Sequence, residues 1–187
     1  MAAPRTIPCR PPPQWERPHI WTDAACDPTT RGRATLGGVL LVGENEVLAW
    51  HLFLDQLPPE WQALIPLDQQ QTIAQLEALA MVVATRVWCT YLRDRRATLW
   101  LDNAPAFFAL VKGYSSSDSL NELVRLEWVA LASSSCDPWF RFVYSENNPA
   151  DGVSRGDWTL ADLWGWTRLS TPHVIAALGA LACPPRA

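Results

Sequence analysis

Residues 19–26, HIWTDAAC, decide the fold, because they place an aspartate, Asp23, inside a strongly apolar run that predicts a β-strand. An unpaired carboxylate in apolar surroundings is costly, so Asp23 must lie at an exposed strand end, be paired, or bind a cation. Three more acids follow or interrupt apolar segments in the same way: Glu77 in TIAQLEALA, Asp102 in ATLWLDNAPA and Asp151 in ENNPADGVSR. Four such acids at separate junctions favour a shared cation.

The segments around Asp23 predict a three-stranded antiparallel meander. Apolar runs cover residues 19–26, 34–43 and 46–54, and turn-forming residues separate them. From Thr72 the hydrophobic period changes to steps of three and four residues, which predicts a helix. Glu77 falls on its apolar stripe, formed by Ile73, Leu76, Ala80, Val83, Val87 and Tyr91.

The second half of the chain alternates strands and helices. ATLWLD, 97–102, predicts a strand, and Pro105 opens a helix over 104–114, a sequence of elements typical of a parallel sheet. A helix over 119–135 and a strand over 137–145 follow. The order is βββαβααβ and then a short helix, which predicts an α/β fold with a mixed five-stranded sheet flanked by helices. If the first and fourth strands pair, Asp23 and Asp102 lie on adjacent strands.

The length of 187 residues and the 49% hydrophobic composition are enough for one domain with a real core. We expect a proline-rich lead-in or linker over 1–17, a domain over 18–160, and a tail over 161–187 with a candidate docking helix. Residues 55–71 predict a polar, proline-broken insertion.

The formal charge of -4 argues against a broadly basic nucleic-acid binder, although a local basic groove stays open. Lys112 is the only lysine, so nearly all positive charge is arginine, whose planar fork matches phosphate oxygens.

The five cysteines are scattered, without the close pairs of zinc ribbons, and indicate reduced thiols: Cys9, Cys26, Cys89, Cys136 and Cys183. No apolar run approaches the roughly 20 residues that span a bilayer, and the start lacks the apolar core of a secretion signal. We expect an intracellular protein, cytoplasmic or nuclear, with no membrane partner.

Each acid also has a simpler interpretation. Asp102 or Asn103 could cap the helix that follows, and Asp151 could be a turn or cap residue before a glycine. Glu77 could pair with an arginine. The joint pattern carries the inference, because no single acid does so.

In their order and spacing, the four acid motifs resemble the ribonuclease H family, particularly the ribonuclease H domains that follow reverse transcriptases in retroelement polyproteins. The resemblance covers residues 18–158. The family motifs T-D-A/G, E-x-x-A-like, D-N/S and N-x-x-A-D are matched by Thr22-Asp23-Ala24, by Glu77 with Leu79 and Ala80, by Asp102-Asn103 and by Asn147-Asn148-Pro149-Ala150-Asp151.

The resemblance implies that Asp23, Glu77, Asp102 and Asp151 are catalytic and hold two Mg²⁺ ions, with Mn²⁺ as an alternative. It implies endonucleolytic cleavage of the RNA strand of an RNA/DNA hybrid, with a reverse transcriptase domain in the same polyprotein. Such selection reads the 2′-hydroxyl in a wide, shallow groove. Gly37, Gly38 and Asn103 are candidate substrate-binding residues, although tight sheet packing explains the two glycines equally well.

One departure from the family is that VYSENNPAD has no histidine before the last acid, which concerns turnover and not metal binding.

Three alternative functions predict different features. A catalytically inactive domain of this fold, serving as a structural or nucleic-acid-binding module, would need none of the four acids. Integrases and transposases place their last acid as a glutamate on a late helix, and proofreading exonucleases begin D-x-E, unlike Asp23-Ala24-Ala25.

Overall fold

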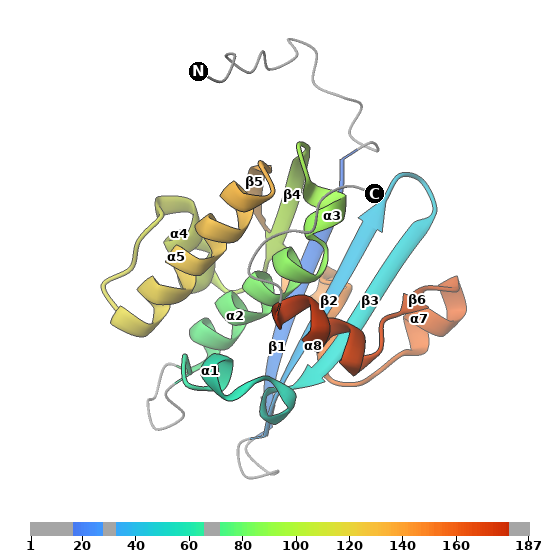
Figure 1. The fold of residues 1–187 in the computed structure, drawn as a ribbon. Coiled ribbons are helices and arrows are strands. Elements are labelled where there is room, and N and C mark those ends of the chain that lie inside the picture. The colour runs from blue at the N-terminus through green and yellow to red at the C-terminus, as the bar shows by residue number, and fades with distance from the viewer. Residues whose placement is uncertain (1–16, 28–32, 66–71, 180–187) are drawn as a thin grey trace.

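The computed structural model describes residues 17–27, 33–65 and 72–179, so the predicted lead-in, apart from Arg17, and the end of the predicted tail lie outside the described residues. Six strands form one mixed sheet in the order β5-β4-β1-β2-β3-β6 (Figure 1). Their bounds are β1 (His19–Asp27), β2 (Arg33–Val42), β3 (Glu46–Phe53), β4 (Arg96–Leu101), β5 (Asp137–Phe142) and β6 (Thr167–Arg168).

The predicted meander and crossover are confirmed. β1 pairs antiparallel with β2, and β2 with β3, whereas β4 pairs parallel with both β1 and β5. β6 was not predicted, because two residues are too few to show strand alternation; it adds to the outer edge of β3 as a parallel strand. The sheet therefore has six strands instead of the predicted five.

The helices are α1 (Pro59–Gln62), α2 (Thr72–Val87), α3 (Cys89–Leu92), α4 (Ala104–Lys112), α5 (Asp118–Ser133), α6 (Ala150–Ser154), α7 (Thr159–Trp164) and α8 (Thr171–Gly179), with 3₁₀ turns η3 (Leu54–Gln56) and η4 (Ser145–Asn147). Figure 1 shows α2, α5 and α8 in front of the sheet. The short helix α6 contacts β1, β2 and β3, and its Ala150 and Val153 join a second core cluster with Val39 and Ala49. No described helix has the length and apolarity that crossing a bilayer requires.

Helix α2 forms the centre of the main core. It contacts β1, β2, α4, α5 and α8, and its residues 78–84 are fully buried, so its apolar surface is wider than the predicted stripe. The helix stops at Val87 instead of continuing to Tyr91, because Trp88 leaves helical geometry (φ -105°, ψ 19°) and its buried ring packs beside Trp50.

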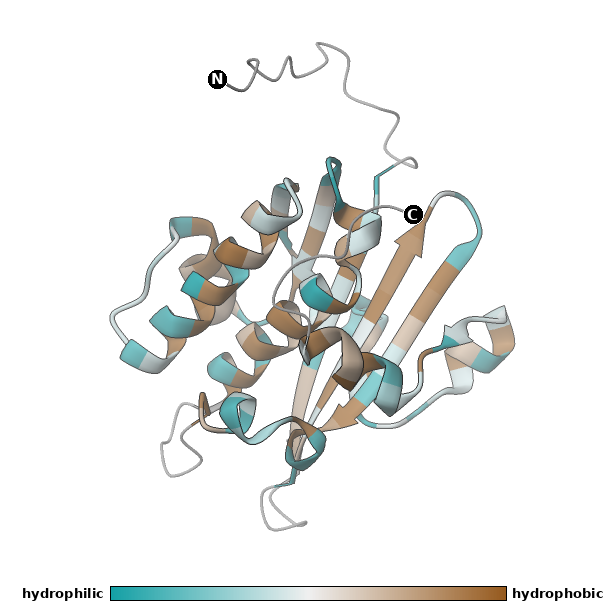
Figure 2. Cartoon of the chain, viewed as in Figure 1, coloured by the Kyte–Doolittle hydropathy of each residue, from teal (hydrophilic) through white to brown (hydrophobic). Residues whose placement is uncertain are grey.

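Figure 2 shows β2 and β3 mostly in hydrophobic colours, whereas α5 carries hydrophilic segments as well. In the predicted tail, Val174 and Leu178 of α8 are buried in the main core. The boundaries of lead-in, domain and tail stay a prediction.

Candidate metal centre

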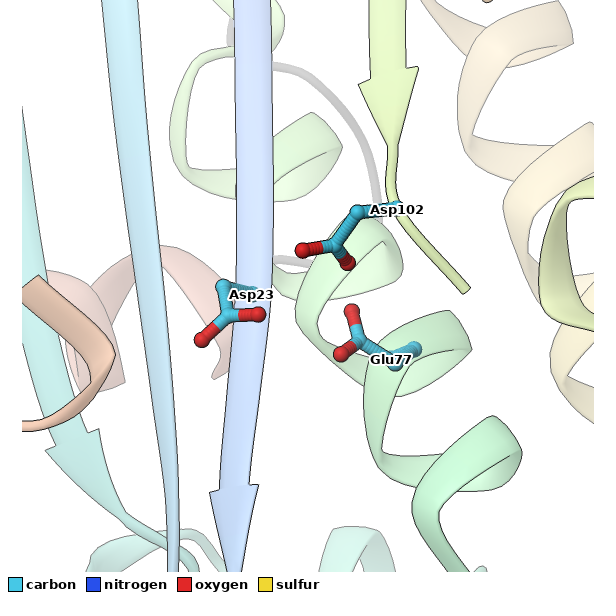
Figure 3. Close-up of side chains that lie close together, drawn as sticks. All are labelled: Asp23, Glu77 and Asp102. Atoms are coloured by element: carbon cyan, nitrogen blue, oxygen red, sulfur yellow. The ribbon is translucent and has the colours of Figure 1, made fainter. Parts of the chain in front are cut away.

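The carboxylates meet where two parallel strands separate. β1 and β4 pair only from His19 to Trp21, and β4 ends at Leu101 while β1 continues to Asp27. Asp23 lies just beyond the paired part of β1, and Asp102 directly follows β4. Figure 3 shows their carboxylates and that of Glu77, from α2, pointing toward one another.

The three carboxylates form a compact cluster. One oxygen from each of Asp23, Glu77 and Asp102 lies within 4.8 Å of the other two. Asp23 is 4% exposed and Glu77 3% exposed, while Asp102 is half-buried. Within residues 17–27, 33–65 and 72–179, no salt bridge joins any of the three to a lysine or arginine. Among these residues Glu77 has no arginine partner, so the simpler interpretation of Glu77 as one half of an arginine ion pair finds no support there.

The surroundings of Asp23 disfavour its charge. The pKa of Asp23 is raised to about 6, chiefly by burial and further by the charges of Asp102 and Asp151, against the opposing effects of a hydrogen bond from Ser154 and of the nearby Arg155. The Ser154 hydroxyl donates to Asp23 Oδ2. This bond joins the N-terminal strand to the helix α6 and fixes the carboxylate.

The surroundings of Glu77 also disfavour its charged form. Burial first, and then the charges of Asp23 and Asp102, hold the pKa of Glu77 well above its usual range. The Ala24 N–H donates to Glu77 Oε1 at 3.2 Å, while Oε2 is buried and has no hydrogen-bond partner among the described residues. A buried polar atom without a partner costs free energy, so this oxygen needs a ligand. A hard divalent cation, which takes carboxylate oxygens, fits this donor set.

Asp151 lies in the same cavity but outside the three-oxygen cluster. Its Oδ1 accepts hydrogen bonds from Arg155 Nε (3.1 Å) and Nη2 (2.9 Å), one helical turn later on α6. The cavity, of about 910 Å³, is lined by all four predicted acids and by Asn103. The role of Asp151 as a fourth ligand stays a prediction.

The predicted substrate-binding residues have structural partners. A Cβ on Gly37 would lie 2.6 Å from the Ser154 backbone nitrogen, and one on Gly38 2.7 Å from the Trp50 ring, so close packing accounts for both glycines. Asn103 caps α4, since its Oδ1 accepts from the Ala106 N–H at 3.1 Å. A role in substrate binding is untested for all three and stays a prediction.

Three residues that shape the site were not predicted from the sequence. Ser154 holds Asp23, Arg155 pairs with Asp151, and Asn148 donates from Nδ2 to the Thr22 carbonyl at 3.0 Å. The signal for the first two was their spacing, three and four residues after Asp151, which places all three on one side of a helix. The contact of Asn148 with β1 left no local signal.

Neither a protein-family model nor a curated protein matches the sequence. Solved structures match the fold. RNase H1 from the archaeon Halobacterium salinarum is 20% identical with a TM-score of 0.55, covering 78% of this chain and 98% of its own. The N-terminal RNase H domain of a Mycobacterium tuberculosis protein is 12% identical with a TM-score of 0.54, covering 80% and 98%. Prototype foamy virus protease-reverse transcriptase is 14% identical with a TM-score of 0.50, covering 81% of this chain but 22% of its own. At these identities the similarity shows a shared fold.

Proposed function

We propose that this chain, which has the ribonuclease H-like fold, is a divalent-metal-dependent endonuclease that hydrolyses the RNA strand of RNA/DNA hybrids. One observation carries the proposal: three carboxylate oxygens from β1, α2 and the end of β4 lie within 4.8 Å of one another, and no lysine or arginine of the described part of the chain forms a salt bridge with them. The fold neighbours support the substrate, because two of them are named RNase H and the third contains a reverse transcriptase.

In this proposal Asp23, Glu77 and Asp102 hold Mg²⁺, or Mn²⁺ in its place, and Asp151 faces them across the cavity as the fourth acid of a two-ion site. When bound, such ions stabilise the attacking and leaving oxygens of a phosphodiester displacement. Ser154 keeps Asp23 oriented toward the cluster. Arg155 holds the Asp151 carboxylate through two hydrogen bonds.

The residues around the carboxylates bear on strand choice. Asn103 uses its Oδ1 for the helix cap, which leaves its Nδ2 protons to donate into the cavity. A 2′-hydroxyl accepts and donates hydrogen bonds, and it is the group that distinguishes RNA from DNA. We assign Asn103 to the contact with the RNA backbone.

The retroelement context is part of the proposal. The foamy virus neighbour carries its matching segment within a much longer protease-reverse transcriptase chain. We propose that a reverse transcriptase domain of the same polyprotein works with this domain, and that residues 1–17 serve as the linker.

The test is cleavage of a hybrid with labelled RNA in Mg²⁺. The wild-type chain should cut this RNA and leave DNA duplex and RNA duplex intact, and Asp102→Asn should lose the activity. Asp118→Asn, an exposed acid at the start of α5, is the matched control and should cut normally. Full activity in Asp102→Asn would refute the assignment. No cleavage by the wild type would favour a non-catalytic module.

A further inference from the structure

Aromatic and basic side chains gather on the sheet beside the carboxylates, on the face opposite α2. In register, Trp21, Trp100 and Arg141 form one row across β1, β4 and β5, and His19, Thr98 and Trp139 form the next. Helix α6 contacts the β1, β2 and β3 part of the sheet. Trp139 is 65% exposed and Arg141 is exposed, so this surface, which we call the tryptophan platform, faces solvent in the described part of the chain.

The platform is ordered by stacking. The Trp21 and Trp100 rings lie 5.9 Å apart with an interplanar angle of 5°, and the His19 ring stacks on both. The Trp100 indole N–H donates to His19 Nδ1 at 3.2 Å, which fixes the stack. The Arg141 guanidinium lies 4.9 Å over the Trp100 ring and leaves its N–H groups at the surface.

The charge of the platform is opposite to that of the protein as a whole. Its cavity, of about 410 Å³, is lined by Arg17, His19, Thr98, Trp100, Trp139 and Arg141, and none of these described lining residues is acidic. Arg141 forms no salt bridge within the described residues. Arg17 Nε is buried with no hydrogen-bond partner among them. A chain of net charge -4 therefore presents arginine donors without carboxylates here, as an anionic ligand requires.

We infer that the tryptophan platform binds an unpaired nucleotide of single-stranded nucleic acid, with the base stacked on Trp139 and the phosphates held by Arg17 and Arg141. Base stacking on an exposed aromatic ring together with arginine contacts is how single strands are bound without sequence preference. An acidic peptide would satisfy the arginines but would leave the exposed indole without a partner. The binding itself needs no metal ion.

The position of the platform links it to the carboxylates. Trp21 and Trp100 each precede an acid of the metal centre by two residues, which is about 7 Å along a strand. Trp139 lies in the next row, beside Thr98 and His19, so a strand of more than one nucleotide that starts on Trp139 would pass Trp100 and Trp21 and run toward Asp102 and Asp23. This link rests on the proposed function, and it makes the platform the site for the unpaired flank of a hybrid.

The test is fluorescence anisotropy of a labelled single-stranded oligonucleotide with the full chain in EDTA, which removes any metal contribution. Trp139→Ala should bind about tenfold more weakly, in the range measured for loss of one stacked base, and Trp139→Phe should keep most of the affinity. Arg141→Ala should weaken binding and lower the salt dependence by about one phosphate contact. Trp164→Ala on α7, where the side chain is 71% exposed, is the matched control and should bind normally.

Failure of this inference is distinct from failure of the nuclease. Absence of oligonucleotide binding by the wild type, or equal binding by Trp139→Ala, would overturn the inference even if hybrids are cut. Binding of polyglutamate in place of the oligonucleotide, lost in Trp139→Ala, would assign the platform to an acidic protein and would also overturn it. If hybrids are cut, those with a single-stranded flank should be cut faster than blunt ones, and Trp139→Ala should lose only that preference.

Discussion

Asp102→Asn should stabilise the metal-free protein and remove its response to Mg²⁺. Two unit charges at 4.8 Å, the upper limit of the separations between these oxygens, repel by roughly 3.5 kcal/mol at an effective dielectric constant of about 20, since 332/(20 × 4.8) is about 3.5. Glu77 has a strongly raised pKa, so near neutral pH the main repulsion is between Asp23 and Asp102. Asp102 is half-buried and partly screened by solvent. We therefore expect a gain of about 1–3 kcal/mol in the free energy of unfolding.

The assay is thermal unfolding in EDTA and in a series of Mg²⁺ concentrations. For a chain of this length, 1 kcal/mol corresponds to about 2–4 °C in the midpoint. The wild type should gain about 2.7 kcal/mol when Mg²⁺ reaches 100 times its dissociation constant, by mass action. Asp102→Asn should start higher in EDTA and gain little, whereas Asp118→Asn should follow the wild type in both conditions.

Two results would refute this reasoning. If Asp102→Asn destabilises the metal-free protein, the three carboxylates do not repel one another and their proximity has another explanation. If the wild type shows no Mg²⁺-linked change at millimolar concentration, the cluster is not a cation site.

Three other predictions concern the surroundings of the site and the core. Ser154→Ala removes the hydroxyl that donates to Asp23, so the pKa of Asp23 should rise above about 6 and half-maximal Mg²⁺ binding should move to higher pH; an unchanged titration curve would contradict this. Gly37→Ala places a Cβ 2.6 Å from the Ser154 nitrogen and should lower the free energy of unfolding by about 1–3 kcal/mol, as measured by urea unfolding. An unchanged free energy of unfolding would show that α6 moves freely. Burial raises the pKa of Glu127 to about 8 from an ordinary 4.5, so the folded state holds a proton that the unfolded state releases. The stability that this bound proton contributes is complete below pH 4.5, and it falls by up to about 1.4 kcal/mol per pH unit as the pH rises toward 8. Glu127→Gln should flatten that part of the pH dependence of the free energy of unfolding, measured by chemical unfolding. An identical slope in the variant would exclude this role of Glu127.

Local hydrophobic pattern was sufficient to predict the elements that position the site. The run around Asp23 and the strand before Asp102 are apolar because both lie in the centre of the sheet, and their pairing follows from the crossover through α2. Glu77 was predicted as unusual because it is an acid within a helix whose neighbours are buried almost throughout. Such contradictions between a residue and its surroundings are visible in sequence.

Contacts between distant segments were not predictable in the same way. Ser154 reaches Asp23 across 131 positions; its spacing from Asp151 places it on the same side of α6, but that spacing does not indicate which distant residue it contacts. The sequence motif grouped Asp151 with the other acids, but the direction of its side chain depends on Arg155 one turn later. The strand carrying Trp139 was predicted, whereas the exposure of this side chain depends on α6 covering β1, β2 and β3.

The central claim is that Asp23, Glu77 and Asp102 together chelate divalent cations. Anomalous diffraction from crystals of the full chain soaked in Mn²⁺ tests it directly. We predict an anomalous peak within coordination distance of all three carboxylates, and no such peak in Asp102→Asn crystals. Saturating Mn²⁺ with no peak at this position in wild-type crystals would contradict the account.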